Sequence, residues 1–119
     1  MFQKNSYTIP SDSSGIFLVR VIQARRVSQR KHAKIGRFLR VAIRNTKPEL
    51  LKRRKKKNRA IIIRSNHTFH KRSNLYYYFS TNSLVILKRR MNTFGKEMYG
   101  PTSLDLRIKK FRVAFSAVF

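Results

Sequence analysis

The sequence predicts a small, mainly β fold, a barrel or a sandwich, and three observations support that class. Apolar segments are short and evenly placed along the 119 residues, and many alternate with polar residues at period two, as half-buried strands do. Clusters of Gly, Asn, Ser and charged residues separate them, as turns do. With 41% hydrophobic residues, the chain can build a small core. We expect a single domain over residues 1–119.

Two strands are predicted in the N-terminal half. Residues 15–24 form the first apolar segment. In residues 39–44, the alternation of Leu39, Arg40 and Val41 predicts a strand with one apolar and one basic face.

Three more strands are predicted in the middle of the chain. Residues 60–65 contain an apolar run directly after a basic one, and residues 76–79 and 84–87 follow after polar turns. Several short strands at this spacing are typical of a small barrel or sandwich.

The C-terminal end predicts one short helix and a last strand. In residues 102–110, Thr102 and Asp105 have the spacing of a capping box, so we expect about two helical turns that buttress the sheet. Residues 111–119 alternate strictly, which predicts a strand. The apolar face of this strand comprises Phe111, Val113, Phe115, Ala117 and Phe119.

Net charge is the strongest indication of function. The chain has 29 Lys and Arg against four acids, a formal charge of +25. Four carboxylates cannot neutralise this charge, so the counter-charge comes from a partner. Nucleic acid is the usual partner, because each phosphate contact also releases condensed counterions. An anionic membrane surface is the alternative, although only the short stretch 102–110 offers an amphipathic helix.

Composition and spacing argue against several other classes. The chain has no Cys, which rules out disulfides and thiolate chemistry. No apolar run approaches the roughly 18 residues that span a bilayer. The carboxylates are scattered and no Gly-rich phosphate loop occurs, so we expect no enzymatic activity and no cofactor. His67 and His70 could offer two imidazoles to a metal, but nothing supplies the remaining ligands.

The densest basic run has seven Lys or Arg among the eight residues 52–59. Such runs are often flexible tails or nuclear-import signals. This run is internal and lies between two predicted strands, so both of its ends are held. We therefore favour a basic loop that enters a cleft between RNA helices.

Other basic residues are spread through the predicted fold, which suits burial among RNA helices better than a single DNA-binding groove. Tyr76, Tyr77 and Tyr78 are expected to divide between the core and base stacking. Arg20, Lys34 and Arg37 add to the positive surface. The candidate RNA-binding residues are Arg25, Arg26, Arg30, Lys31, Arg40, Arg44, Lys52, Arg53, Arg54, Lys55, Lys56, Lys57, Arg59, Lys71, Arg72, Lys88, Arg89 and Arg90.

Short motifs along nearly the whole chain occur in the order known from one protein family. They are Met1-Phe2-Gln3, Asp12-Ser13-Ser14-Gly15, Leu18-Val19-Arg20-Val21-Ile22, Arg30-Lys31-His32-Ala33-Lys34-Ile35-Gly36, Ala60-Ile61-Ile62-Ile63-Arg64-Ser65, Phe79-Ser80-Thr81-Asn82-Ser83, Tyr99-Gly100-Pro101, Asp105-Leu106-Arg107 and Lys110-Phe111. In these motifs the chain resembles the bacterial and organellar type of large-subunit ribosomal protein fourteen.

The resemblance implies a closed five-stranded β-barrel with a projecting β-ribbon and short C-terminal helical turns. It implies a structural role in which the chain binds large-subunit rRNA and neighbouring large-subunit proteins, reaches small-subunit rRNA at an intersubunit bridge, and does not insert into membranes. The candidate residues for the intersubunit or partner surface are Lys47, Pro48, Lys96 and Glu97. A free basic module that binds RNA or DNA outside the ribosome is the alternative.

Two departures from the family pattern stand out. Arg53-Arg54-Lys55-Lys56 replaces a Lys-Lys-Gly-Asp turn, which exchanges an acid for a base and deepens the positive field. Lys96-Glu97 replaces a Thr-Arg pair on the surface where the family's ribosome-silencing factor docks, so the resemblance leaves open whether such a factor binds this chain.

Composition and the start of the match bear on location. Phe, Tyr, Ile, Asn and Lys, which have A/T-rich codons, total 44 residues, whereas Ala, Gly and Pro total 13. The match to the family begins at Met1, which leaves no room for a transit peptide. We therefore expect a protein of the mitochondrial ribosome, in the matrix, that is encoded by the organelle genome, with a plastid as the alternative.

Overall fold

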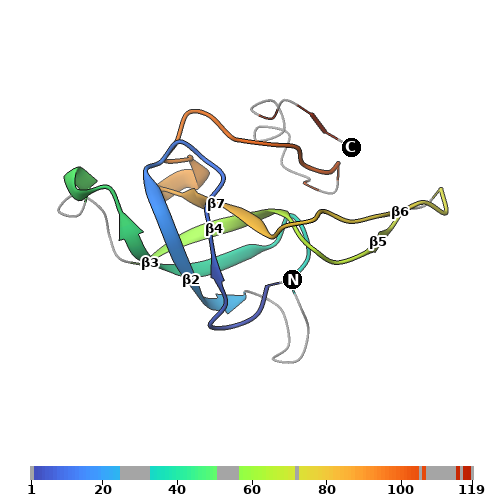
Figure 1. Cartoon of the computed structure of the whole chain (residues 1–119), viewed down its shortest axis with the longest axis horizontal. Coiled ribbons are helices and arrows are strands. Elements are labelled where there is room, and N and C mark those ends of the chain that lie inside the picture. Colours follow the sequence, from blue (N-terminus) through green and yellow to red (C-terminus); the bar gives the residue numbers. More distant parts are fainter. Residues whose placement is uncertain are drawn as a thin grey trace.

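The computed structural model describes residues 2–24, 33–50, 57–71, 73–104, 106, 115 and 117–118 (Figure 1). The fold is mainly β, as predicted. The elements are β1 (Tyr7–Thr8), β2 (Ile16–Ala24), β3 (Phe38–Thr46), the 3-10 turn η1 (Pro48–Leu50), β4 (Lys57–Arg64), β5 (Phe69–His70), β6 (Tyr76–Tyr77), β7 (Ser83–Leu87) and the 3-10 turn η2 (Arg89–Met91). The strands predicted at 15–24, 39–44, 60–65 and 84–87 are confirmed as β2, β3, β4 and β7.

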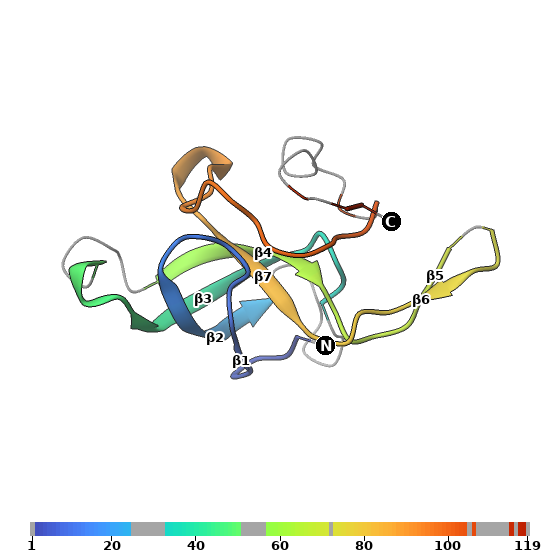
Figure 2. The ribbon, with the colours of Figure 1, turned by 45° about the horizontal axis from the view of Figure 1, so that its top comes forward.

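Five strands form one antiparallel sheet in the order β1-β2-β3-β4-β7 (Figures 1 and 2). Register shifts interrupt the β2–β3 pairing at three points. Bulges of this kind bend and twist a strand, so the sheet curves around its apolar inner side.

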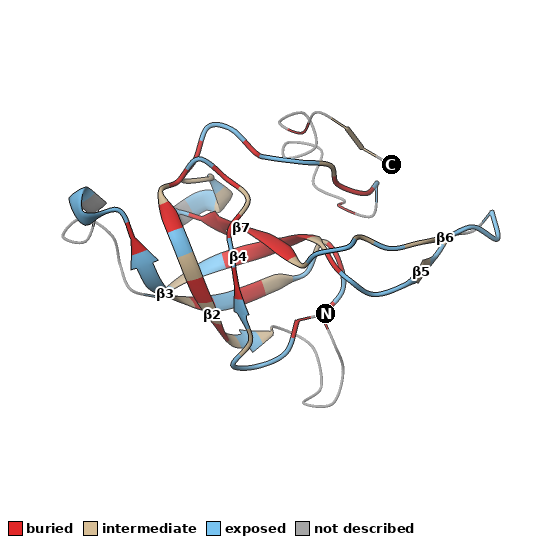
Figure 3. Ribbon diagram, in the orientation of Figure 1, coloured by how far each residue is buried: buried red, intermediate tan, exposed pale blue. Residues whose placement is uncertain are grey.

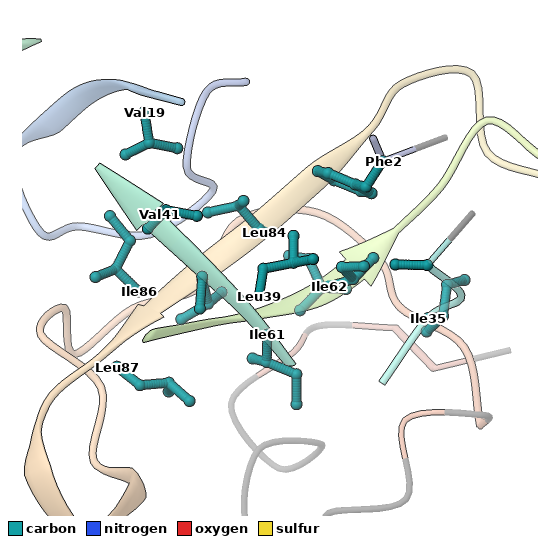
Figure 4. Packing of buried hydrophobic residues seen from close by; sticks show 14 of the residues in the cluster. Phe2, Val19, Ile35, Leu39, Val41, Ile61, Ile62, Leu84, Ile86 and Leu87 are labelled. Atoms are coloured by element: carbon teal, nitrogen blue, oxygen red, sulfur yellow. The ribbon is translucent and has the colours of Figure 1, made fainter. Parts of the chain in front are cut away.

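The core lies mainly on the concave side of this sheet (Figure 4). Residues directly opposite each other on paired strands point to the same face of the sheet, so the strand pairing identifies the residues of the inner face. The inner face includes Val21 opposite Val41, Leu39 opposite Ala60, and Ile62 opposite Leu84, all fully buried.

Residues 60–63 of β4 and the whole of β7 are buried on both faces of the sheet (Figure 3). Ala60 to Ile63 and all of β7 lack exposed side chains, which explains why the sequence there is a continuous apolar run instead of an alternation. Leu106 and Phe115, from the C-terminal segment, belong to the same buried cluster.

The closed barrel that the resemblance implied is not formed, because the sheet stays open between β1 and β7. The link between these edges is one isolated bridge, Pro10 to Leu84, beside a hydrogen bond from the Ser11 amide to the Leu84 carbonyl (3.0 Å). The hydroxyl of Thr8 also donates to the carbonyl of Asn82 (3.4 Å), but no continuous ladder of described residues joins β1 to β7.

A projecting β-ribbon is present, as the resemblance implied. Strands β5 and β6 form a separate two-stranded sheet that extends away from the main sheet in both views (Figures 1 and 2). The predicted strand at 76–79 contributes only β6 to it. The turn of this hairpin contains Asn74 with a φ of 58°, a left-handed conformation that Asn tolerates.

The predicted C-terminal helical turns are absent from the described residues of this end. Thr102, the expected N-cap, forms a parallel bridge with Val118, and its hydroxyl donates to the carbonyl of Ile63 (3.0 Å). The Thr102 side chain is fully buried, and the β4 carbonyl gains a partner that it needs there. Residues 107–114 lie outside the described part. Of the apolar face predicted for 111–119, Phe115 and Ala117 are described: Phe115 is buried, and Ala117 is half-buried.

Candidate nucleic-acid interface

Basic side chains gather on the face of the sheet opposite the inner core residues. The β3–β4 register places Arg40 directly opposite Arg59, and Ala42 opposite Lys57. Directly opposed residues project to the same face, and Lys57 and Arg59 share that face because they are two residues apart. All three cations are exposed.

Two further cations extend this surface. Arg20 of β2 lies opposite Ala42, and Arg44 follows two residues after Ala42 on β3. Tyr7 of β1 lies opposite Arg20 and is 59% exposed, so the row crosses four strands. Arg20 is half-buried, and its Nε has no hydrogen-bond partner in the described structure. We name the set Arg20, Arg40, Arg44, Lys57 and Arg59 the cationic face.

The exposed cations of this face have no carboxylate partner among the described residues. Two like charges directly opposed on neighbouring strands destabilise a sheet. Asp12 is buried and accepts hydrogen bonds from the amide (3.3 Å) and hydroxyl of Ser14. Within the described ranges, no ion pair joins Arg40, Lys57 or Arg59 to a carboxylate. An anion bound between Arg40 and Arg59 would relieve this repulsion.

The other predicted basic residues lie elsewhere or outside the described part. The ammonium of Lys71 lies 4.9 Å from the Tyr77 ring centroid, that of Lys88 lies 5.3 Å from the Phe94 ring centroid, and Arg90 is exposed in η2. The structure does not describe Arg25, Arg26, Arg30, Lys31, Lys52, Arg53, Arg54, Lys55, Lys56, Arg72 or the side chain of Arg89. The basic loop at 52–56 remains a prediction.

Comparison with known families decides the class of protein. The model of the family "Ribosomal protein L14p/L23e" matches residues 1–118. The chain belongs to the L14p/L23e family of ribosomal proteins. One curated relative, "Large ribosomal subunit protein uL14m" of Tetrahymena pyriformis, is 34% identical over 115 residues, which cover 97% of each chain.

Membership of the L14p/L23e family confirms the resemblance drawn from the short motifs. It makes the chain a structural component of the large ribosomal subunit and confirms that it is not an enzyme. No helix in the described ranges is long and apolar enough to cross a membrane.

In this L14p/L23e chain, the residues predicted for the intersubunit surface lie around one loop, 12–15. The amide of Lys47 donates to the carbonyl of Gly15 (3.0 Å). The amide of Ser13 donates to the carbonyl of Glu97 (3.0 Å), and the Glu97 amide donates to the Ser13 hydroxyl (3.1 Å). The structure therefore brings Lys47-Pro48 and Lys96-Glu97 to the same loop, with all four side chains exposed.

Arg64 is a structurally important cation to which the sequence assigned no role. Its Nη1 donates to the carbonyls of Tyr99 (2.7 Å) and Pro101 (2.9 Å), and its Nη2 donates to the hydroxyl of Ser11 (2.6 Å). Burial lowers the pKa of the Arg64 guanidinium below its usual value. The position of Arg64 at the end of an apolar strand was the available signal, because a cation there needs buried acceptors.

The two histidines weighed as metal ligands make ring contacts. His67 packs edge-on against Phe69 with ring centroids 5.6 Å apart, and His70 packs against Tyr76 at 4.8 Å. The described residues contain no group of three or more His, Cys, Asp or Glu that could hold a metal ion.

Proposed function

We propose that the chain binds large-subunit rRNA through the cationic face, as part of the mitochondrial ribosome. The observation that supports this most strongly is the direct opposition of Arg40 and Arg59, next to Lys57, without a carboxylate partner in the described structure. A phosphate between opposed guanidinium groups replaces repulsion by two charge-assisted contacts.

The chemistry of the residues fits phosphates. Four of the five members of the cationic face are Arg, whose planar guanidinium offers paired donors to phosphate oxygens. They lie on paired strands and are thereby held at fixed spacing. A rigid row of this kind suits the regular backbone of an RNA helix, where shape and phosphates are recognised more than sequence.

A second proposal concerns the loop at 12–15 and the residues around it. Lys47, Pro48, Lys96 and Glu97 are exposed there, and we assign to them the contact with small-subunit rRNA across the subunit interface. Support comes from the convergence of two distant segments on one loop. The two Lys of this surface can pair with phosphates, and ordered water can fill the remaining contacts, including those near Glu97.

Location in the mitochondrion is supported by the relative named uL14m and by the A/T-rich codon bias of the composition. We also propose that the organelle genome encodes the chain. Isolated mitochondria supplied with labelled methionine should then synthesise it.

Sedimentation of a mitochondrial lysate through a sucrose gradient tests the function. The chain, detected by antibody, should migrate with the large subunit and remain there after a high-salt wash, because an assembled ribosomal protein makes many phosphate contacts at once. A peak among the free proteins would contradict assembly into the subunit and favour a free RNA- or DNA-binding module.

A further inference from the structure

The β5–β6 hairpin presents aromatic side chains on both of its faces. Phe69 is opposite Tyr77, and His70 is opposite Tyr76. Opposed residues share a face, and Tyr78 lies on the side of Tyr76 because it is two residues further on. We name His70, Tyr76 and Tyr78 the outer aromatic face.

The other side of the hairpin already has a structural role. The rings of Phe69 and Tyr77 stack with centroids 5.4 Å apart, and both residues pack against the hydrophobic core. The hydroxyl of Ser103, from the C-terminal segment, is hydrogen-bonded to the phenolic oxygen of Tyr77 (2.9 Å). This contact holds the hairpin in place and leaves the outer aromatic face pointing away from the core.

The outer aromatic face is exposed to an unusual degree. Tyr76 is 71% exposed and Tyr78 is 67% exposed, and His70 is also exposed. Leu75, at the turn, is 62% exposed and adds apolar surface beside them. A contiguous exposed patch of large rings marks a binding surface more often than scattered apolar residues do.

We propose that the outer aromatic face stacks on unpaired RNA bases, an inference that rests on the proposed binding of rRNA. The ring centroids of His70 and Tyr76 lie 4.8 Å apart and the ring planes are tilted by 52°, so the two rings are not stacked face to face. A base can lie on the open face of either ring. Stacking of this kind tolerates any base, because every base has a π face.

Charge favours RNA over a protein partner at this site. No Asp or Glu occurs between Glu49 and Glu97, so the whole hairpin lacks a carboxylate that would repel phosphates. The ammonium of Lys71, at the turn, lies over the ring of Tyr77 on the other face of the hairpin, so the hairpin carries a cation within the same short element. Aromatic rings interleaved with cations are the usual composition of surfaces that bind single-stranded nucleic acid.

Binding of the full chain to a short single-stranded oligoadenylate, and to an abasic analogue with the same phosphates, tests the proposal. Wild-type protein should bind the oligoadenylate more tightly. Tyr76→Ala and Tyr78→Ala should each lower that affinity by about tenfold, without changing the salt dependence, because stacking is lost and phosphate contacts are not. Affinity for the abasic analogue should stay the same.

Two control variants make the result specific to the rings. Tyr76→Phe keeps the ring and should bind as wild type does. Tyr99→Ala removes a 54% exposed tyrosine outside the hairpin and should also leave binding unchanged.

The remaining outcomes separate the two proposals. Equal binding of both probes by wild type and Tyr76→Ala would overturn the stacking proposal and leave phosphate binding intact. Normal binding of RNA by Tyr76→Ala, together with its loss from large subunits, would assign the outer aromatic face to a protein neighbour and overturn stacking. Failure of the wild-type chain to bind either short probe would overturn the stacking proposal alone, because binding of rRNA through the cationic face is tested separately by sedimentation and by salt dependence.

Discussion

Arginines in this chain differ in what their guanidinium groups are bound to. Arg64 donates to three oxygen acceptors within the protein, so its charge stabilises the fold. Arg40 and Arg59 face one another across two strands, and no such acceptors are present for them in the described ranges. Arg40 and Arg59 are therefore available to a partner anion, whereas Arg64 is already bound within the protein.

The contact between Arg64 and Gly100 gives a prediction at the residue scale. Gly100 has a φ of 80°, and an added Cβ would lie 2.6 Å from Nη1 of Arg64. Gly100→Ala should therefore destabilise the chain by about 1–3 kcal/mol from left-handed strain alone, and by more because the guanidinium must move. Urea denaturation measures this change in the free energy of unfolding.

A double-mutant cycle separates the two causes. In an Arg64→Ala background the steric part of the cost disappears, and only the left-handed strain at Gly100 remains. An equal cost of Gly100→Ala in both backgrounds would show that the guanidinium of Arg64 does not lie against Gly100.

At the scale of the elements, the long strands were predictable from the sequence, whereas the two-residue strands β1 and β5 were not. In β3, the alternation around Arg40 is the direct result of one buried and one exposed face. β1 and β5 have two residues each, which is too short for any period to show. Their strand conformation depends on pairing with partners distant in sequence or across a turn.

The predictions for sheet closure and for the C-terminal helix failed for tertiary reasons. Between the β1 edge and β7, the described residues form one isolated bridge and a few single hydrogen bonds instead of a ladder, and local sequence does not specify such long-range pairing. Thr102 has the local sequence of an N-cap, but a buried carbonyl of β4 takes its hydroxyl. An isolated helix of two turns is too weak to compete with such a contact.

Two leucines in the C-terminal segment form a matched pair for a prediction about this element. Leu106 is fully buried in the core cluster, whereas Leu104 is 56% exposed. Leu106→Ala should destabilise the fold by about 2–5 kcal/mol, because it leaves a cavity. Leu104→Ala removes the same atoms from the surface and should change the free energy of unfolding by less than about 0.5 kcal/mol.

Phe115→Ala should behave like the Leu106 variant and cost about 3–5 kcal/mol, since this ring is also buried. Thermal denaturation of the three variants checks the order. Similar losses for Leu104→Ala and Leu106→Ala would mean that the segment does not cover the sheet as described.

At the scale of the whole molecule, net charge dominates the energetics. A charge of +25 on 119 residues destabilises the compact state by self-repulsion. Small domains keep only about 0.05–0.15 kcal/mol of stability per residue, so this repulsion is a large part of the balance. The proposed binding of rRNA to the folded chain would stabilise it by mass action and so couple folding to assembly.

The residues of the cationic face were recognisable in the sequence by their charge, but their arrangement on one face of the sheet was not. Arg40, Arg44, Lys57 and Arg59 were all candidates from charge alone. Their presence on one face follows from the register of β3 against β4, which no local pattern specifies. Arg20 joins them for the same reason, through its pairing with Ala42.

The salt dependence of binding to large-subunit rRNA tests most directly whether the cationic face contacts phosphates. The variant Arg40→Gln/Lys57→Gln/Arg59→Gln should flatten the slope of log affinity against log salt by about 2–3, at ~0.7–0.9 per lost phosphate contact. The control Lys4→Gln/Lys34→Gln/Arg37→Gln removes three exposed charges that lie outside the cationic face, and its slope should stay close to that of wild type. Equal flattening by both variants would show that total charge, and not the cationic face, binds the RNA, and an unchanged slope in the first variant would contradict the account outright.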